Sequence, residues 1–369
     1  MAKMASLARL SRRTWRNAWA VRKQKHVRLR QQFWDMARLK VATSLGPDDY
    51  FRYALYDRER VPDRKTAATF GGWRLFEEFR HYSEPQIQAL AHKHTLYRLL
   101  EAFDLPVPAI RRVYAPVPDA FERHRALRSR DELHDYLCTT DDLPLFGKPS
   151  SAAGGYGAVG IVGRRGGGRL LLLDGREPTL DEVVDDIDGI ASERRTYLLT
   201  ELLRQRDDIR ALCGDTVASL RTVMLVRDGE PEVFRVAILL PTGRQQTSNS
   251  LHLTTGTLVG QVDPATGRIG RVIRSTGPFF EYAERHDETG ARLEGATIAD
   301  WDGFLAVMHR AALALSPFRM QHWDVALTDR GPVLMEMNFH GAEDLLQMHG
   351  PPGVYDEQYL SFRKNHRVW

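Results

Sequence analysis

One stretch near the C-terminal end of the chain, residues 322–338, constrains the fold more than any other. Its sequence, HWDVALTDRGPVLMEMN, predicts two short strands joined by a polar turn at residues 328–331. Because side chains alternate between the two faces of a strand, Glu336 and Asn338 project from the same face, and Asp324 lies on the partner strand. Two carboxylates and an amide that converge in this way form a hard-oxygen site that suits Mg2+.

An ordinary hairpin with its polar residues in water would carry the same three side chains. However, the apolar residues between them predict a strand pair that is partly buried, and a buried Glu is uncommon without a partner. These apolar residues are Val325, Leu327, Val333, Leu334, Met335 and Met337. The hairpin by itself leaves both interpretations open, so the rest of the chain has to decide between them.

Length and composition are those of a soluble globular protein. A chain of 369 residues can form two or three lobes with a substantial core. The two cysteines, Cys138 and Cys213, are far apart and lack metal-type spacing, so neither a disulfide framework nor a zinc site is indicated. No apolar run has the length of a membrane span or of a signal-peptide core. We therefore expect a cytoplasmic protein.

The basic charge is concentrated at the N-terminal end. Residues 1–40 hold twelve Lys or Arg and one acid, Asp35, so their charge is +11, and the overall +4 leaves −7 for residues 41–369. Few helix breakers and regularly placed Leu and Trp predict one or two helices here. Three roles fit: a helix on an anionic membrane surface, a contact with another protein, or Trp packing on the domain. No nucleic-acid motif accompanies the charge, which disfavours nucleic acid as a partner.

Two lysines and a glycine-rich loop precede the middle of the chain. EPQIQALAHKHTLYRLLEAFDLPVP predicts a helix that contains Lys93. LPLFGKPSSAAGGYGAVGIV predicts a strand that ends in Lys148, then a loop, then a strand from Ala158. Glycines in such a loop let backbone N–H groups approach a phosphate. The spacing fits neither the P-loop nor the dinucleotide fingerprint, and for the loop alone a glycine-rich hairpin is the favoured explanation.

Further strands carry an acid and an arginine. An apolar strand at residues 197–199 leads to Glu201, and the first of two longer strands that follow contains Arg221. Helices are predicted at about residues 180–192 and 301–316, and the glycines at 166–168 are explained by a turn between strands.

Taken together, six segments resemble the ATP-grasp superfamily. They are FGKPSSAAGGYGAVGI, YLLTELL, ASLRTVML, LTTGTLVGQVDPATGRI, RHDETGARLEG and HWDVALTDRGPVLMEMNFHG. Each is weak alone, but six in the right order over roughly residues 85–350 are specific. The chain looks most similar to the sugar-transfer-associated ATP-grasp branch, which is related to alpha-L-glutamate ligases. The resemblance implies an α+β ATP-grasp fold, in which two α+β subdomains grip ATP, preceded by a small N-terminal domain and the basic helical arm.

The resemblance implies a set of nucleotide contacts. Lys93 and Lys148 match the two lysines that approach the phosphates, and the loop matches the mobile lid over them. The loop positions implied are Ser150, Ser151, Gly154, Gly155 and Gly157. Glu201 and the backbone through Leu202 and Leu203 match the hinge at the adenine edge, although many relatives have a charged residue in place of Leu202. Gln205 or Asp207 falls where a ribose contact is expected.

The resemblance also implies the metal site and the catalytic groups. Asp324, Glu336 and Asn338 match the metal-binding trio, so the implied cofactors are ATP and Mg2+, with Mn2+ as an alternative. Arg221 matches a basic residue that faces the γ-phosphate, and with Lys148 it would neutralise the charge that develops during phosphoryl transfer. No side-chain nucleophile is needed.

The acceptor pocket is the least specific part of the sequence. Arg274, His286 and His340 are expected beside the phosphates, and Asn249 and His252 are further residues that could line this pocket. Arg274 could hold a substrate carboxylate in a bidentate fork. Taken alone, each of these residues is more often structural.

The leading function is an ATP-dependent carboxylate–amine ligase that forms an amide through an acylphosphate. Its substrates would be small-molecule or peptide carboxylates and amines, in the assembly or modification of a cell-surface or secondary metabolite. Two rivals remain: an ATP-dependent kinase that phosphorylates a hydroxyl, and a non-catalytic nucleotide-binding scaffold recruited through the arm. The presence of both lysines and the whole metal trio argues against the scaffold but does not separate ligase from kinase.

The predicted organisation has four parts. They are a basic helical arm (1–45), an N-terminal domain (46–140), a small ATP-grasp subdomain with the glycine-rich loop (141–200) and a C-terminal subdomain with the metal site (201–369). The sequence does not define the oligomeric state.

Overall fold

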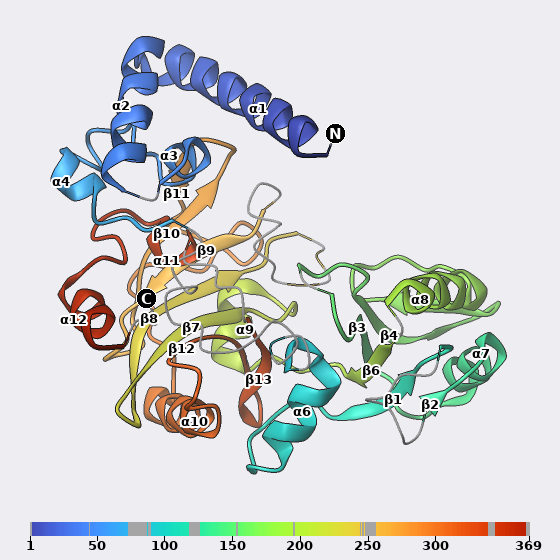
Figure 1. The fold of residues 1–369 in the computed structure, drawn as a ribbon. Coiled ribbons are helices and arrows are strands. Elements are labelled where there is room, and N and C mark those ends of the chain that lie inside the picture. The colour runs from blue at the N-terminus through green and yellow to red at the C-terminus, as the bar shows by residue number, and fades with distance from the viewer. Residues whose placement is uncertain are drawn as a thin grey trace.

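The computed structural model has two separate β-sheets with helices packed on them (Figure 1). It describes residues 2–43, 45–72, 87, 90–117, 126–152, 154–194, 196–243, 245, 247, 256–338 and 344–366. The predicted α+β fold class is confirmed, because most strands pair antiparallel and the helices lie between or beside the strand runs rather than alternating with parallel strands.

The first lobe is a six-stranded sheet covered by two helices. Its elements are β1 Ile110–Tyr114, β2 Ala126–Leu127, α7 Arg130–Thr139, β3 Leu145–Pro149, β4 Val159–Arg165, β5 Arg169–Leu172, α8 Leu180–Arg194 and β6 Tyr197–Glu201. The strand order is β2-β1-β6-β3-β4-β5, and β1 and β2 form the one parallel pair. Helices α7 and α8 pack side by side and bury Leu137 and Val184 against Leu145 and Leu199.

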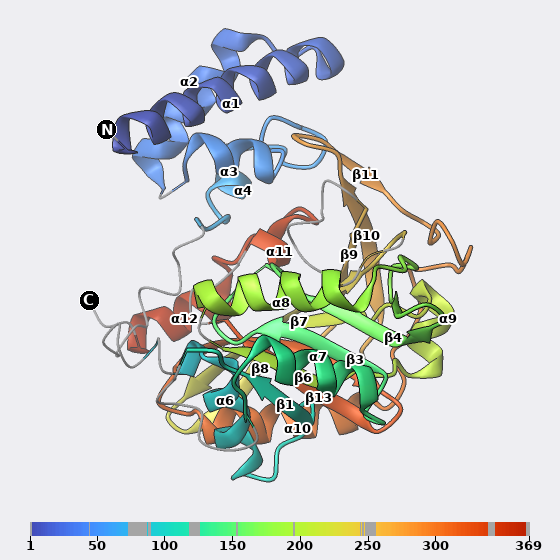
Figure 2. The ribbon, with the colours of Figure 1, turned by 90° about the vertical axis from the view of Figure 1, so that its right-hand side faces the viewer.

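The second lobe is built on a seven-stranded antiparallel sheet. Its elements are α6 Lys93–Glu101, α9 Asp207–Cys213, β7 Ser219–Arg227, β8 Glu230–Leu240, β9 Leu258–Val262, β10 Ile269–Ser275, β11 Phe280–Tyr282, α10 Trp301–Ala314, β12 Met320–Thr328, β13 Gly331–Met337, α11 Asp344–Gln347 and α12 Glu357–His366. The strand order is β11-β10-β9-β8-β7-β12-β13. Strand β7 is buried along almost its whole length, because α10 covers one face of the sheet and α11 and α12 cover the other (Figure 2).

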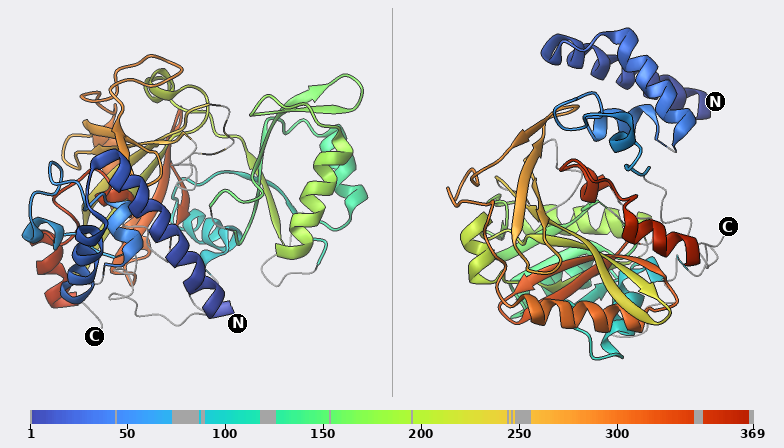
Figure 3. Two further views of the ribbon diagram at one scale, coloured as in Figure 1. Left: turned by 90° about the horizontal axis from the view of Figure 1, so that it is seen from above. Right: turned by 90° about the vertical axis from the view of Figure 1, so that its left-hand side faces the viewer.

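Helix α6 connects the two lobes. Leu96 and Leu100 pack in the core of the second lobe, whereas Tyr97, on another side of the same helix, packs with Val113 and Leu198 of the first sheet. The two lobes stand side by side in Figure 3.

Four helices at the N-terminal end pack on the second lobe. They are α1 Ala2–Lys25, α2 Leu29–Ala42, α3 Pro47–Arg52 and α4 Arg64–Ala67. One hydrophobic core contains Ala18, Val21 and Met36 of α1 and α2 together with Phe234 and Val259 of the second sheet. Buried residues of segment 45–70 also belong to this core. Helices α1 and α2 form the outermost layer of the molecule (Figures 1 and 2).

No helix in the part of the chain that the structure describes has the length and apolarity needed to cross a membrane.

The structure confirms the hairpin on which the sequence argument rests. Strands β12 and β13 pair antiparallel across the predicted turn, with Thr328 opposite Gly331 and Asp324 opposite Glu336. The predicted boundary between residues 140 and 141 falls inside one lobe. Strands β1 and β2 and helix α7 precede this boundary, yet β1 pairs with β6 and α7 packs on α8.

Gly147 of β3 has no room for a side chain. A Cβ added there would lie 2.7 Å from Cε1 of the fully buried Tyr197 ring. We expect Gly147→Ala to lower the free energy of unfolding by about 1–3 kcal/mol, as overpacking does, and urea unfolding measures this. Gly163→Ala on the neighbouring strand is the matched control, because nothing lies within 4 Å of its added Cβ. Equal stability of the two variants would contradict the packing described here.

Candidate functional site

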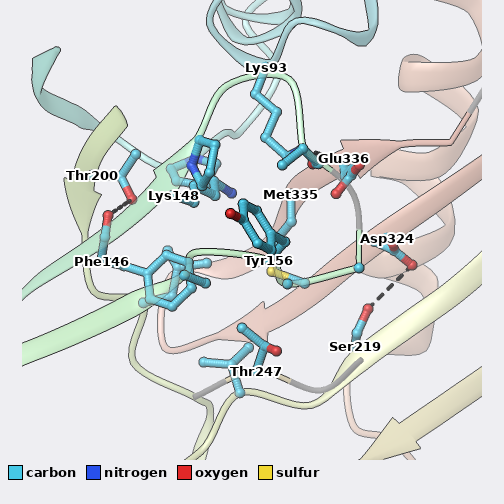
Figure 4. A pocket seen from close by; sticks show the side chains of 18 of the residues that line it. Lys93, Phe146, Lys148, Tyr156, Thr200, Ser219, Thr247, Asp324, Met335 and Glu336 are labelled. Atoms are coloured by element: carbon cyan, nitrogen blue, oxygen red, sulfur yellow. Dashed lines mark hydrogen bonds and ion pairs between the residues drawn. The ribbon is translucent and has the colours of Figure 1, made fainter. Parts of the chain in front are cut away.

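A cavity of about 450 Å3 lies where the two sheets face each other. Its walls come from β3 and β6 of the first lobe, from β7, β12 and β13 of the second, from the start of α6 and from the loop before β4. This size is typical of pockets for small-molecule ligands. Figure 4 shows the labelled side chains around it.

Three polar side chains of the hairpin and Arg221 meet at one end of the cavity. Strands β7 and β12 pair with Arg221 opposite Asp324. The guanidinium forks the carboxylate, with Nε donating to Oδ1 at 2.7 Å and Nη2 donating to Oδ2 at 3.0 Å. Nδ2 of Asn338 also donates to Oδ2 of Asp324, at 2.9 Å. The predicted trio and the predicted arginine therefore line the same cavity.

Lys93 lies beside the second carboxylate. Its Nζ is 3.3 Å from Oε1 of Glu336 and donates to the backbone oxygen of Ala152, at 2.6 Å, in the glycine-rich loop. The backbone N–H of Lys93 donates to the oxygen of Ser150 at the start of that loop. Lys93 therefore connects the loop to the carboxylate end of the cavity.

The donor set at this end fits a hard divalent cation. Asp324 and Glu336 supply carboxylate oxygens. A flip of the Asn338 side-chain amide, which exchanges its oxygen and nitrogen, would present the amide oxygen to the same cation. The described residues contain no group of three or more His, Cys, Asp or Glu placed to hold a metal. A set of two carboxylates and an amide leaves coordination positions for phosphate oxygens and water, as Mg2+ sites commonly do.

One nitrogen of Arg221 is unsatisfied. Its Nη1 is buried and has no hydrogen-bond partner among the described residues. Because a buried donor without an acceptor is costly, an anionic oxygen bound in the cavity would be stabilised at this position.

Lys148 is held by an aromatic side chain of α6. Its Nζ donates to Oη of Tyr97 at 2.8 Å, and Tyr97 Oη in turn donates to the backbone oxygen of Met335 at 2.6 Å. Burial lowers the pKa of Lys148 to about 8, although Glu336 and Asp324 partly oppose this shift. An anionic group bound beside the Lys148 ammonium would stabilise its charged form and raise its pKa again.

Much of the cavity lining is apolar. It includes Phe146, Leu202, Leu203, Leu239 and Met335, and an apolar slot of this kind suits a flat aromatic ring. Glu201 also lines the cavity, but its carboxylate accepts from the backbone N–H of Ala109 at 2.9 Å and from Arg330 at 2.5 Å. Glu201, the acid of the predicted hinge, therefore links β6 to Ala109 and Arg330. The residues that follow it, Leu202 and Leu203, lie beside the slot.

The predicted loop residues divide into two groups. Gly154 and Gly155 line the cavity, with φ of 74° and 70° that only glycine adopts without strain. Gly157 lies against Ile190, where an added Cβ would come within 2.9 Å of a side-chain carbon. Ser150 is fully buried with its hydroxyl 2.7 Å from Nδ1 of His92, and neither it nor the exposed Ser151 belongs to the cavity lining.

The two residues predicted near the ribose lie outside the cavity lining. The Gln205 side chain is buried, donates to the backbone oxygen of Gly214 at 2.7 Å and accepts from the N–H of Ala218. Asp207 begins α9 and pairs with Arg210 at the surface. Both side chains have structural partners in this conformation.

Of the predicted acceptor residues, Arg274 and His286 are likewise outside the lining. Arg274 forms an ion pair with Asp287. His286 is buried, with its Nε2 2.8 Å from the backbone oxygen of Pro241. His340, Asn249 and His252 lie outside the described residues.

Several residues that line the cavity or support its lining were not predicted from the sequence. Tyr97 follows Lys93 by one helical turn, and Ser219 precedes Arg221 by two residues on the same strand face, so periodicity could have found both. Oγ of Ser219 is 3.5 Å from Asp324 Oδ1. Tyr156, which extends from the loop into the cavity in Figure 4, carries no such signal.

Comparison with protein families places residues 77–359 in one model, described as sugar-transfer associated ATP-grasp. The match covers more than half of the chain. Comparison with curated proteins found no relative that matches.

Among solved structures, the chain is similar to D-alanyl-alanine synthetase A from Vibrio cholerae O1 biovar eltor, with 10% identity, a TM-score of 0.42, and coverage of 74% of this chain and 64% of that one. It is also similar to the VanG D-Ala:D-Ser ligase from Enterococcus faecalis, with 13% identity, a TM-score of 0.40, and coverage of 75% and 61%. The chain thus spans less than two thirds of the length of these proteins.

Proposed function

The chain belongs to the sugar-transfer-associated ATP-grasp family, and we propose that it is an ATP-dependent carboxylate–amine ligase. The observation that carries the proposal is the arrangement of charge in the cavity. Lys93, Lys148 and Arg221 surround the paired carboxylates of Asp324 and Glu336, and an apolar slot continues from them. A purine in the slot would direct a triphosphate toward this charged end.

In this proposal the cations of the cavity hold the phosphates. Arg221 would turn its unsatisfied Nη1 to a γ-phosphate oxygen, and Lys148 would exchange the hydroxyl of Tyr97 for a phosphate oxygen or share both. Mg2+ held by Asp324, Glu336 and Asn338 would withdraw charge from the β- and γ-phosphates. Preorganised positive groups of this kind stabilise the charge that spreads in phosphoryl transfer.

The proposed reaction has two steps. A carboxylate oxygen of the first substrate attacks the γ-phosphorus, the bond to the β–γ bridging oxygen breaks, and ADP leaves with that oxygen. The amine of the second substrate then attacks the acyl carbon, and phosphate leaves with the carboxylate oxygen. The loop that Lys93 ties to the cavity would exclude water from the acylphosphate between the steps. We place this activity in the cytoplasm.

The pH dependence of ATP use provides one prediction. The pKa of Lys148 is lowered from 10.5 to about 8, so the free protein loses the charge of this side chain as the pH rises through about 8. We expect kcat/KM for ATP, which reports the free enzyme, to fall above that pH. Between pH 8 and 10.5 the unfolded chain retains the proton longer, so the contribution of Lys148 to stability rises with pH.

Lys148→Arg separates this group from others that titrate nearby. Arginine stays protonated, so the fall in kcat/KM near pH 8 should disappear from the profile of this variant. Lys364→Arg at an exposed position is the matched control and should keep the fall. An unchanged alkaline limb in Lys148→Arg would show that another group causes it.

Trapping with hydroxylamine tests the proposed function. The full chain is incubated with ATP, Mg2+ and a library of carboxylic acids and alcohols, and hydroxylamine converts any acylphosphate into a hydroxamate. A hydroxamate from one acid, with an equal amount of ADP, is the expected result. A stable phosphorylated alcohol without hydroxamate would instead establish a kinase. Nucleotide binding without ADP formation across a library of both acids and alcohols would favour the scaffold.

A further inference from the structure

Helices α1 and α2 each bury one side toward the rest of the molecule. Among residues 12–25 of α1 the buried ones are Thr14, Ala18 and Val21, at helical spacing, and on α2 they include Gln32 and Met36. Gln32 donates to the backbone oxygens of Ala18 and Val27 and so joins the two helices. The packing of these sides fixes which residues of both helices face outward.

Over the part of the two helices whose side chains the structure describes, the opposite side carries basic and apolar residues. We call it the basic-aromatic face, and it consists of Arg12, Arg16, Trp19 and Lys23 on α1 and Arg30, Trp34, Arg38 and Val41 on α2. The spacing within each set is three or four residues, so each set follows one stripe of its helix. All eight side chains are exposed.

The large apolar side chains of this face are exposed to solvent. Trp19 is 45% exposed, Trp34 is 60% exposed, and Val41 near the end of α2 is 90% exposed. Trp15, beside the face, is 50% exposed while its ring packs 4.9 Å from that of Phe33. Exposed apolar groups of this size on two neighbouring helices indicate a binding site.

The charge of the face is uncompensated. Arg13 and Lys25 pair with Asp48 and Asp57 on the inward side. Asp35, the one acid of the two helices, pairs with Arg58. Within the described residues, no ion pair involves the five cations of the basic-aromatic face. Instead, the guanidinium of Arg38 lies over the ring of Trp34 at 4.6 Å.

We propose that the basic-aromatic face binds an anionic lipid surface. Indole rings favour the boundary between headgroups and acyl chains, and guanidinium and ammonium groups attract anionic headgroups. Duplex nucleic acid would satisfy the charge but would leave two isolated indoles and Val41 without apolar partners. An acidic protein would be expected to find a groove, whereas this face lies on the two helices that form the outermost layer of the molecule (Figure 2). The proposal does not depend on the ligase activity.

The experiment measures sedimentation of the full chain with vesicles. One set consists of phosphatidylcholine alone, and the other of phosphatidylcholine mixed with phosphatidylserine. The chain should sediment with the mixed vesicles at least tenfold more strongly than with the neutral ones, and added salt should weaken this binding. Equal binding to both sets, or binding to neither, would overturn the proposal.

A triple variant tests the basic component of the face. Arg12→Gln with Arg16→Gln and Lys23→Gln should weaken binding by about fivefold for each charge removed. The control removes three charges elsewhere, through Arg111→Gln, Arg292→Gln and Lys364→Gln, and should bind as the wild type does. Equal losses in the two triple variants would show a general charge effect and reject the face. Circular dichroism establishes that each variant retains its helices.

The aromatic component is tested by Trp19→Ala with Trp34→Ala. This variant keeps every charge, so reduced sedimentation with the mixed vesicles supports insertion of the rings, and undiminished sedimentation rejects it. A single-stranded RNA homopolymer is the competing ligand in a parallel assay. If RNA binds and the mixed vesicles do not, the face recognises nucleic acid and the lipid proposal fails.

Discussion

Glu336→Gln is expected to lower ATP turnover by about 100-fold or more while leaving the protein folded. The substitution preserves volume but removes one of the two carboxylates in the donor set for Mg2+ and the partner of Lys93. The side chain is 28% exposed, so the uncharged amide can be solvated without unfolding the hairpin. ADP release measures turnover, and thermal unfolding measures the fold.

The control for this variant is Glu294→Gln, which removes the same charge at an exposed position outside the cavity. It should retain wild-type turnover. Raising the Mg2+ concentration should partly restore activity to Glu336→Gln if the residue binds metal. Wild-type turnover in Glu336→Gln would contradict a role of Glu336 in the metal site, and collapse of the fold would mean that Glu336 is a structural residue of the hairpin.

Arg221→Lys is expected to reduce kcat by about 100- to 1000-fold. Lysine keeps the charge, but it can neither fork both oxygens of Asp324 nor present a third nitrogen to a phosphate. The matched control is Arg227→Lys at the end of the same strand, which pairs with Glu232 and lies outside the cavity lining. Similar kcat values for the two variants would contradict the role of the fork.

The hairpin and its polar trio could be predicted because their signals are local. Alternation along residues 322–338 fixed the strands, and a two-residue spacing fixed the shared face of Glu336 and Asn338. The partnership of Arg221 with Asp324 rests on the pairing of β7 with β12, which are about a hundred residues apart in sequence. Local patterns do not determine which strands of a sheet are neighbours or their register.

Polar residues near the site were harder to interpret. Gln205 follows the predicted hinge closely in sequence, but its amide satisfies backbone groups at Gly214 and Ala218 inside the lobe. A sequence does not distinguish a buried amide that holds a turn from one that faces a ligand, because both require the same residue type. The domain boundary at residue 140 failed to anticipate the pairing of β1 with β6 for a related reason, since that contact is non-local.

Transfer of 18O from the substrate carboxylate tests the account most directly. The acid identified by hydroxamate formation is labelled in both carboxylate oxygens and incubated with the full chain, ATP, Mg2+ and the amine. If the carboxylate attacks the γ-phosphate, each inorganic phosphate released carries one 18O atom, and mass spectrometry detects it. Unlabelled phosphate formed together with the amide would show that no acylphosphate lies on the pathway and would contradict the proposed mechanism.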